Sequence, residues 1–209
     1  MKQPMVFASS NTGKQSEIRA RFKSLPYDIQ LQTDLGVEDI PETGLSFIEN
    51  AILKARHACQ STGFQAFSDD SGLEIDALNG EPGVRSARYA GEDKNFEANI
   101  DQVLSRMKHI PESERTARFR CVMVWMFAAN HPSPVVFEGY WEGMITFERK
   151  GQGGFGYDPI FYVPEQQCTA AELSSCLKNK ISHRANALNQ LLRFFKSDQY
   201  QAITARQGR

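Results

Sequence analysis

Two adjacent aspartates, Asp69 and Asp70, are the side chains in this sequence with the clearest chemical potential. They lie between apolar residues that are typical of strand ends, and the Ser71-Gly72 pair that follows predicts a turn. Neighbouring carboxylates repel each other unless a cation or a shared proton offsets their charge. The pattern therefore favours a divalent-metal site over a solvated loop. Taken alone, the pair also fits a structural cation site or a glycosidase-like acid and base.

A strand, a small-residue loop and a helix are predicted near the beginning of the chain. The apolar run 5–9 is typical of a buried strand, and apolar residues recur at helical spacing over residues 14–25. The loop at 9–14 would aim backbone N–H groups and a helix N-terminus at a phosphate. It is not a Walker A loop, because Ala8 replaces the leading glycine and a glutamine, Gln15, follows the lysine. A plain helix cap is the alternative interpretation.

A loop rich in carboxylates, residues 38–44, precedes a second predicted helix. Ser46 and Glu49 form a capping box that marks the start of this helix. Asn50 and Lys54 are four residues apart and therefore share one of its faces. That face is either a solvated surface or, through Lys54, a contact for a triphosphate.

The middle of the chain supplies the elements that would position these groups. Strands are predicted at 28–33 and 73–78, and a helix is predicted at 95–107. The β-prone stretches 116–127 and 135–147 predict a long hairpin in the centre of a curved sheet. Alternating strands and helices indicate a single α/β unit.

Two further segments have residue types suited to a nucleoside base. The glycine-rich stretch 151–156 allows close backbone approach to a ligand, and Phe155 and Tyr157 could stack on a flat ring. A flexible hairpin loop is the alternative there. Farther on, a serine N-cap places His183 and Arg184 in the first turn of a helix. The helix dipole disfavours cations at this position unless an anion or an acceptor-rich ligand lies nearby.

Composition narrows the class of protein. The 209 residues are 41% hydrophobic and 23% charged, and the formal net charge of -1 gives no general attraction for nucleic acid or an anionic membrane. The four cysteines show neither a C-x-x-C pair nor zinc-ligand spacing, which favours free thiols in a reducing cytosol. No signal peptide or transmembrane run is recognised, so we expect a cytoplasmic enzyme or binding protein. Residues 1–197 are the predicted domain, and 198–209 form a polar tail that is expected to fray.

Six motifs occur in one order along the chain. Together they resemble the inosine/xanthosine triphosphate pyrophosphatase family, and the resemblance covers residues 5–195. The motifs are Ser9-x-Asn11-x-Gly13-Lys14, Glu42-Thr43-Gly44-x-x-Phe47-x-Glu49-Asn50-Ala51, Asp69-Asp70-Ser71-Gly72-Leu73, Pro82-Gly83-x-x-Ser86-Ala87-Arg88, Gly153-Gly154-Phe155-Gly156-Tyr157-Asp158-Pro159-Ile160-Phe161 and Ser182-His183-Arg184. Ser10 and Leu177 depart from the family pattern, which often has glycine and glutamate there.

The resemblance implies a fold, a reaction and a partner. The implied fold is α/β, an elongated two-lobed single domain with a long mixed curved β-sheet flanked by helices and a central active-site cleft. The implied reaction is Mg²⁺-dependent hydrolysis of dITP, ITP and XTP to the monophosphate and pyrophosphate, which clears these nucleotides from the pool. The implied assembly is a homodimer with no nucleic-acid or membrane partner.

The resemblance also implies roles for individual residues. Glu42 and Asp70 match the metal positions, Asp70 matches the proton acceptor, and Asp69 is its candidate catalytic neighbour. The remaining matches are substrate-binding positions. They are Ser9, Ser10, Asn11, Thr12, Gly13, Lys14, Lys54, Ser71, Phe155, Gly156, Tyr157, Asp158, Lys178, His183 and Arg184.

Two alternative functions are compatible with the same residues. A Maf-like nucleotide pyrophosphatase would share the general fold but prefer other bases, and the motifs at 155–158 and 182–184 argue against it. A non-catalytic nucleotide-binding protein would bind ITP without releasing pyrophosphate. The retention of both Asp69 and Asp70 argues against that alternative, because binding alone would avoid their mutual repulsion.

Overall fold

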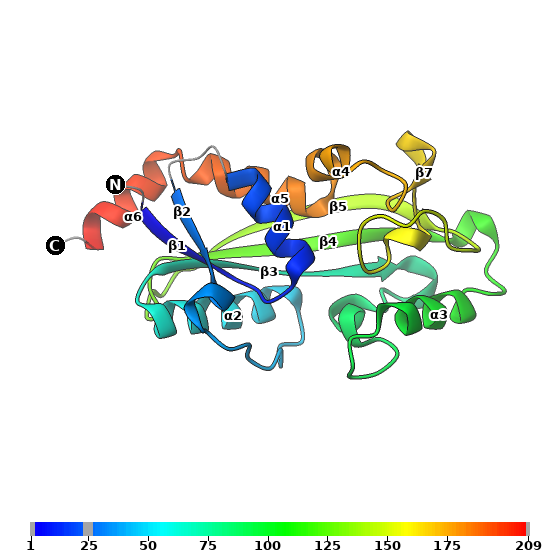
Figure 1. Cartoon of the computed structure of the whole chain (residues 1–209), viewed down its shortest axis with the longest axis horizontal. Helices are drawn as coiled ribbons and strands as arrows, with labels where there is room; N and C mark the ends of the chain where they lie inside the picture. Colours follow the sequence, from blue (N-terminus) through cyan, green and yellow to red (C-terminus); the bar gives the residue numbers. More distant parts are fainter. Residues whose placement is uncertain (1–2, 23–26, 208–209) are drawn as a thin grey trace. The chain divides into compact units, whose positions relative to one another are not determined.

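The structure is a computed structural model that describes residues 3–22 and 27–207. A mixed sheet has the strand order β2-β1-β3-β4-β5-β6-β7, with parallel pairs at β1/β2 and β1/β3 and antiparallel pairs at β5/β6 and β6/β7 (Figure 1). The strands are β1 Gln3–Ala8, β2 Tyr27–Leu31, β3 Gln65–Ile75, β4 Thr116–Met126, β5 Val135–Ile145, β6 Phe161–Val163 and β7 Cys168–Thr169. The helices are α1 Thr12–Phe22, α2 Phe47–Thr62, α3 Phe96–Arg106, α4 Ser175–Ile181, α5 His183–Phe194 and α6 Asp198–Gln207. The predicted α/β class with a mixed sheet and flanking helices is confirmed.

The chain divides into two compact units that interleave along the sequence. Unit 1 contains residues 1–70, 122–138 and 187–209, and unit 2 contains residues 71–121 and 139–186. The elongated shape and the cleft implied by the resemblance stay predictions, as does the domain boundary at residue 197.

Unit 1 is built on both faces of β1, because alternate residues of a strand point to opposite faces. One face carries Val6 and Ala8, which pack with Ala51, Ala55 and other small residues of α2. The other face carries aromatic rings. Phe7 lies 5.0 Å from Phe67 of β3, and Phe22 of α1 stacks on Phe67 at 5.5 Å. Helices α1 and α2 therefore cover opposite faces of these strands, as Figure 1 shows.

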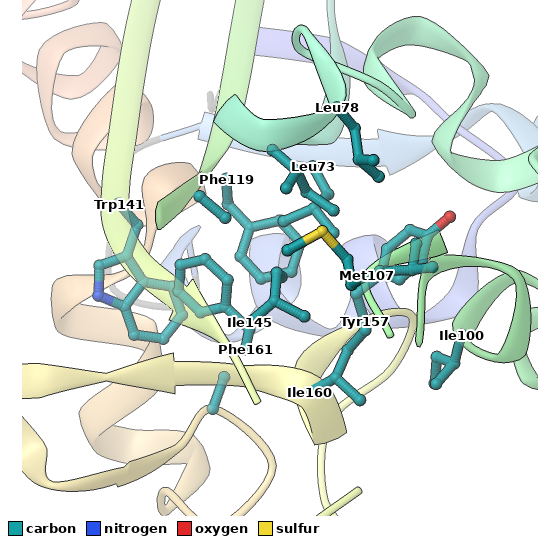
Figure 2. Packing of buried hydrophobic residues seen from close by; sticks show 14 of the residues in the cluster. Leu73, Leu78, Ile100, Met107, Phe119, Trp141, Ile145, Tyr157, Ile160 and Phe161 are labelled. Carbon is teal, nitrogen blue, oxygen red and sulfur yellow. The ribbon is translucent and has the colours of Figure 1, made fainter. Parts of the chain in front are cut away.

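Unit 2 has its own core of large apolar side chains. Leu73 and Ile75 of β3 pack with residues of α3, β4, β5 and β6 in one buried cluster (Figure 2). Within it, Phe119 lies 4.4 Å from Phe161, measured between ring centroids, and Trp141 lies 5.4 Å from Phe161. Since the cluster includes Tyr157, the glycine-rich segment is anchored directly to this core.

Several predicted elements form close to their expected bounds. Ser46 caps α2 by accepting a hydrogen bond from the Glu49 amide, and Asn95 caps α3 in the same way through Ala98. The two long β-prone stretches form β4 and β5, which are neighbours in the sheet. The first predicted helix forms α1 up to Phe22, and its expected end at Leu25 lies outside the described residues.

Two expectations about local structure are wrong. The predicted turn at Ser71-Gly72 does not form, because β3 continues through it to Ile75 and the two aspartates lie within the strand. The extended backbone at Gly72 is buried, and sheet pairing overrides the local turn tendency. Residues 198–207 of the tail also do not fray, since they form α6, whose Tyr200 is 5% exposed and packs on Trp125 and Phe195.

Candidate active site

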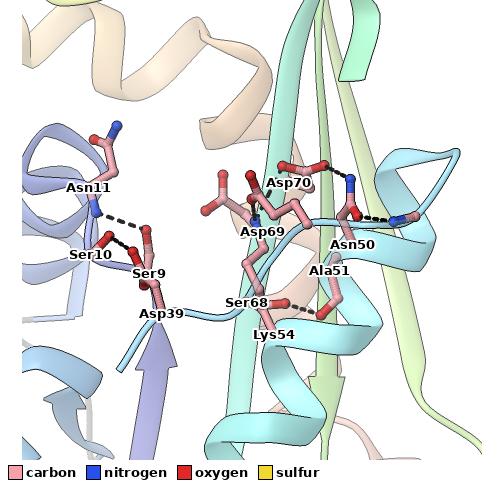
Figure 3. Close-up of polar contacts among 12 residues, drawn as sticks. Ser9, Ser10, Asn11, Asp39, Asn50, Ala51, Lys54, Ser68, Asp69 and Asp70 are labelled. Carbon is pink, nitrogen blue, oxygen red and sulfur yellow. Dashed lines mark hydrogen bonds and ion pairs between the residues drawn. The ribbon is translucent and has the colours of Figure 1, made fainter. Parts of the chain in front are cut away.

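The loop between β1 and α1 is shaped by hydrogen bonds from its own polar side chains. The Asn11 side chain accepts a hydrogen bond from the Lys14 amide at 3.0 Å, and its carbonyl accepts one from the Gln15 amide at 2.9 Å. The Ser9 hydroxyl accepts a bond from the Asn11 amide at 3.3 Å (Figure 3). Asn11 therefore acts as the N-cap of α1, and the positive end of this helix lies at the predicted phosphate loop.

Asp69 is the most deeply buried carboxylate of this region, with an exposed fraction of 0%. Its Oδ2 lies 2.9 Å from the ammonium nitrogen of Lys14, at the start of α1. A carboxylate in such a position requires a counter-charge, because removal from water penalises the ionised form. Lys14 supplies that charge, and Asp69 in turn holds Lys14 beside β3.

Asp70 belongs to a second cluster, centred on Lys54 of α2 (Figure 3). The Lys54 ammonium lies 2.8 Å from Glu42 Oε1 and 3.2 Å from Asp70 Oδ1. Asn50, one turn before Lys54, donates its amide to Asp70 Oδ2 at 3.1 Å. The same Asn50 side chain accepts a bond from the Gly44 amide at 2.8 Å. Asn50 thus joins the carboxylate-rich loop to β3.

Burial and charge act in opposite directions on the two titratable groups at the centre of this cluster. Burial raises the pKa of the Asp70 carboxyl, while the Lys54 and Lys14 ammonium groups oppose that rise. Burial lowers the pKa of Lys54, but the carboxylates of Asp70 and Glu42 together outweigh it, so the net pKa is raised. Lys54 therefore keeps its proton, and Asp70 is more basic than an exposed aspartate.

Glu42 and Asp70 are suitable ligands for a divalent cation. No group of three or more His, Cys, Asp or Glu side chains that could hold a metal ion occurs among residues 3–22 and 27–207. Mg²⁺, however, is often bound by only one or two carboxylates together with substrate phosphates and water. Glu42 and Asp70 direct an oxygen at the same ammonium group, so they already converge on one cation. This donor set fits Mg²⁺ arriving with a polyphosphate.

Unit 2 contains a separate cluster around the glycine-rich loop. The Asp158 side chain accepts a hydrogen bond from the Phe155 amide at 2.8 Å and forms an ion pair with Lys178 of α4. A Cβ atom at Gly154 would lie 2.0 Å from Asp158 Oδ2, so only glycine allows this turn. Asp158 therefore organises both the loop and the lysine.

Phe155 is half-buried and has cations near its ring. The Lys178 ammonium lies 4.7 Å and the Arg184 guanidinium 5.7 Å from the ring centroid, which is within cation–π range. His183 begins α5, and its ring stacks on Phe119 at 4.8 Å. Ser182 accepts a hydrogen bond from the Ala185 amide at 3.3 Å, as predicted for an N-cap. Lys178, His183 and Arg184 are all buried.

Tyr157 has a different environment from Phe155. Its ring is 3% exposed within the core of unit 2, and its hydroxyl donates to the Ser86 carbonyl at 2.8 Å. Burial raises the pKa of the Tyr157 hydroxyl. Protein atoms already pack this ring, so of the two aromatic residues Phe155 is the better candidate for stacking on a base.

The predicted site residues thus fall into two clusters, each within its own unit. Lys14 connects the loop at 9–14 to Asp69 by an ion pair, and Lys54 forms ion pairs with both Glu42 and Asp70. Phe155, Asp158, Lys178 and Arg184 lie together, whereas half-buried Ser71 follows Asp70 along β3.

Sequence reasoning missed Asn50 as a site residue. A solvated surface was one interpretation of its helix face, but Asn50 is 2% exposed. Its spacing of four residues from Lys54 was the signal that could have identified it.

Comparison with known proteins identifies first the enzyme class of this protein and then its family. A "dITP/XTP pyrophosphatase" of Photorhabdus laumondii is 52% identical over 190 residues, which is 91% of this chain and 96% of the relative. One of Escherichia coli K12 is also 52% identical, with the same coverage. The predicted enzyme class, a nucleoside triphosphate pyrophosphatase, is confirmed by these relatives.

The solved structures agree with the sequence relatives. A HAM1 protein from Coxiella burnetii has a TM-score of 0.87 and 47% identity, and covers 93% of this chain and 98% of its own. The Staphylococcus aureus Ham1 protein has a TM-score of 0.82 and 42% identity, with the same coverage. The model of the Ham1 family matches residues 5–194, and the chain belongs to this family.

Proposed function

We propose that the protein hydrolyses dITP, XTP and ITP to the nucleoside monophosphate and pyrophosphate. Family membership and the names of the relatives support this choice of substrates over those of a Maf-like enzyme. The observation that carries the proposal is the buried Asp70 carboxylate, held between the Lys54 ammonium and the Asn50 amide. A fixed carboxylate of raised basicity beside cationic groups is suited to accept a proton next to a polyphosphate.

Different residues of the chain are proposed to accept the proton and to stabilise the leaving pyrophosphate. Asp70 takes the proton of the water that attacks the nucleotide. Lys14 and Lys54 stabilise the negative charge that develops on the departing pyrophosphate, together with backbone N–H groups of the loop at 9–14. Asp69 keeps Lys14 in place through the 2.9 Å contact.

Glu42 and Asp70 are the residues that we propose to hold Mg²⁺. When bound, such a cation neutralises phosphate oxygens and lowers the pKa of a coordinated water. Lys54 already contacts both carboxylates, so its ammonium group would become available to the phosphates if Glu42 and Asp70 held a metal cation instead. The proposed metal and Lys54 would therefore both offset the negative charge of the phosphates.

The base is proposed to bind in the cluster of unit 2. Hypoxanthine and xanthine present an acceptor at O6, which buried donors of Lys178, His183 or Arg184 could satisfy. Adenine has a donor amine at that position, so buried donors would face each other. One unsatisfied buried group reduces binding by roughly ten- to a hundredfold, and several together would exclude ATP.

The remaining parts of the proposal are the assembly and the compartment. We retain the homodimer and the cytoplasm as proposals, and free thiols at all four cysteines fit a reducing compartment. Within the described ranges 3–22 and 27–207, no helix combines the length and apolar character needed to cross a membrane.

The test is pyrophosphate release from dITP, XTP, ITP, ATP and GTP, each with and without Mg²⁺. We expect release from the first three only, and only with the metal. Equal turnover of all five, or turnover of none, would contradict the proposal. Binding of ITP without any pyrophosphate would instead identify a non-catalytic nucleotide-binding protein.

A further inference from the structure

The hydroxyl of Ser10 is hydrogen-bonded to a residue outside the predicted phosphate loop. Ser10 is exposed, and its Oγ donates a hydrogen bond to Oδ2 of Asp39, twenty-nine residues later in the chain (Figure 3). The hydroxyl proton is therefore used by a carboxylate of the protein. Ser10 can still offer its backbone to a phosphate, but the donor of its side chain has a different partner.

Asp39 has a second contact that fixes it independently of Ser10. Its Oδ1 accepts a hydrogen bond from the side-chain amide of Gln32 at 2.5 Å, and Gln32 is only 4% exposed. The Gln32 carbonyl accepts the Val37 amide at 3.0 Å, which closes the turn before Asp39. Within the described residues, no ion pair to a lysine, arginine or histidine is formed by Asp39. Two neutral donors thus define the position of this carboxylate.

A parallel link joins the same two segments. Gln15 of α1 donates its side-chain amide to the Ser9 carbonyl at 2.8 Å and to the Thr33 hydroxyl at 3.2 Å. The phosphate loop is therefore tied at Ser9 and at Ser10 to residues 32–39. The Asn11 contacts lie within the loop and the first turn of α1. The contacts with residues 32–39 connect the loop to a second segment of the chain.

We propose that Asp39 is a positioning residue for triphosphate binding, which acts by holding Ser10 and thereby the backbone of the loop at 9–14. The inference rests on the proposed function of that loop. A carboxylate near a polyanion is electrostatically unfavourable, so its presence requires a compensating role. Hydrogen bonds to a charged acceptor are stronger than neutral ones, and they hold an exposed serine in one orientation.

Position and charge can be separated with two substitutions. Asp39→Ala removes both hydrogen bonds and the charge, so the loop loses its outer support. Asp39→Asn keeps one carbonyl oxygen that can accept the Ser10 hydroxyl, and its NH2 group replaces the oxygen that faces Gln32, whose side-chain amide must turn to present its own oxygen. The substitution also removes the repulsion of the phosphates. The positioning role therefore predicts opposite effects of the two variants on nucleotide affinity.

The experiment measures kcat and KM for dITP with the full-length chain, and the Kd for inorganic tripolyphosphate by calorimetry. We expect Asp39→Ala to raise KM and Kd about tenfold with kcat within about threefold, the pattern of a lost binding contribution. Asp39→Asn should leave both constants at or below those of the unsubstituted protein. Ser10→Ala should raise both constants at least as much as Asp39→Ala, because it breaks the same contact and keeps the Asp39 charge, and the double variant should bind no more weakly than Ser10→Ala.

Asp34→Ala is the matched control, because Asp34 lies on the same segment but forms an exposed ion pair with Arg19. It should leave KM and Kd unchanged. Unchanged constants in Asp39→Ala, or additive effects of the two single variants, would overturn the positioning role. Equal losses in Asp39→Asn and Asp39→Ala would overturn it too. If the unsubstituted protein releases no pyrophosphate, the proposed function fails, while the tripolyphosphate constants still test Asp39.

Discussion

At the scale of single residues, the site combines each carboxylate with a particular cation. Lys14 contacts Asp69, and Lys54 contacts Asp70 together with Glu42. The two neighbouring aspartates therefore have different partners, and each cation offsets the repulsion between the carboxylates on this strand. Asp70 also has the Asn50 amide on its other oxygen. We propose Asp70 as the proton acceptor of the pair, since Asp69 is 0% exposed and its Oδ2 contacts Lys14.

Replacing Asp70 by asparagine tests the proposed proton acceptor. Asp70→Asn keeps the shape of the side chain but removes its basicity, so pyrophosphate release from dITP should fall at least about a hundredfold. The fold should be retained, as judged by circular dichroism and the melting temperature. Asp34→Asn, at an exposed position, should retain full activity. If Asp70→Asn keeps most of its activity, another group accepts the proton.

Replacing Lys54 by methionine tests whether its ammonium occupies the position of a divalent cation. Removal of this charge makes the potential at Glu42 and Asp70 more negative, so the nucleotide-free protein should bind Mn²⁺ about tenfold more tightly. Titration calorimetry measures this directly. Lys14→Met, whose contact is with Asp69, should change Mn²⁺ affinity less. Weaker Mn²⁺ binding in Lys54→Met would mean that the lysine and the metal do not compete.

At the scale of elements, α2 brings the lysine and amide of the site to β3. Its capped start at Ser46 sets the rotation of the helix, which then directs Asn50 and Lys54 to one side, four residues apart. The small residues Ala51 and Ala55 allow the helix to pack closely on β1. A helix with larger side chains there would lie farther from the strands and carry Lys54 away from Asp70.

The N-cap of α2 is open to a stability test. In Ser46→Ala the Glu49 amide loses its acceptor, and the free energy of unfolding should fall by about 1 kcal/mol. Urea denaturation measures this loss. Ser61→Ala, near the exposed end of the same helix, should change it by less than about 0.5 kcal/mol. An equal effect of both substitutions would show that the cap contributes nothing specific.

At the scale of the whole molecule, each unit has a core of its own, and β3, β4 and β5 contribute residues to both. The apolar cores are supplemented by ion pairs between polar side chains on the sheet and at the ends of its strands. Arg118 of β4 contacts Asp76 at 2.8 Å and Glu142 of β5 at 3.1 Å. Hydrogen bonds from Arg118 and then Thr116 lower the pKa of Asp76.

This pKa predicts how global stability changes with pH. Because the folded-state pKa of Asp76 is lowered, its contribution is complete above the ordinary value of about 4 and is lost as pH falls through the folded-state value. Asp76→Asn should therefore cost about 0.2–1 kcal/mol at pH 7, a small effect because the pair is partly exposed. The difference should shrink below about pH 4 in urea titrations. A difference that grows in acid would contradict the assignment.

Much of the fold and part of the candidate site could be predicted from local patterns. Helix α2 follows from the capping box at Ser46, and β4 and β5 follow from long β-prone stretches, because such signals act within a few residues. The local turn signal at Ser71-Gly72 gave the wrong result, since pairing with neighbouring strands outweighs it. The burial of Asn50 and the packing of α6 likewise depend on distant partners.

By itself, the sequence determined the family, the enzyme class and the candidate site residues, because the motifs are short and their order along the chain is specific. Only the tertiary structure decided how these residues pair. Lys54 and Asp70 are 16 residues apart, and Ser10 and Asp39 are 29 apart. No local pattern encodes such contacts, because they form only when α2 and the loop before it pack against β1 and β3. The two aspartates of one motif thereby acquire different partners.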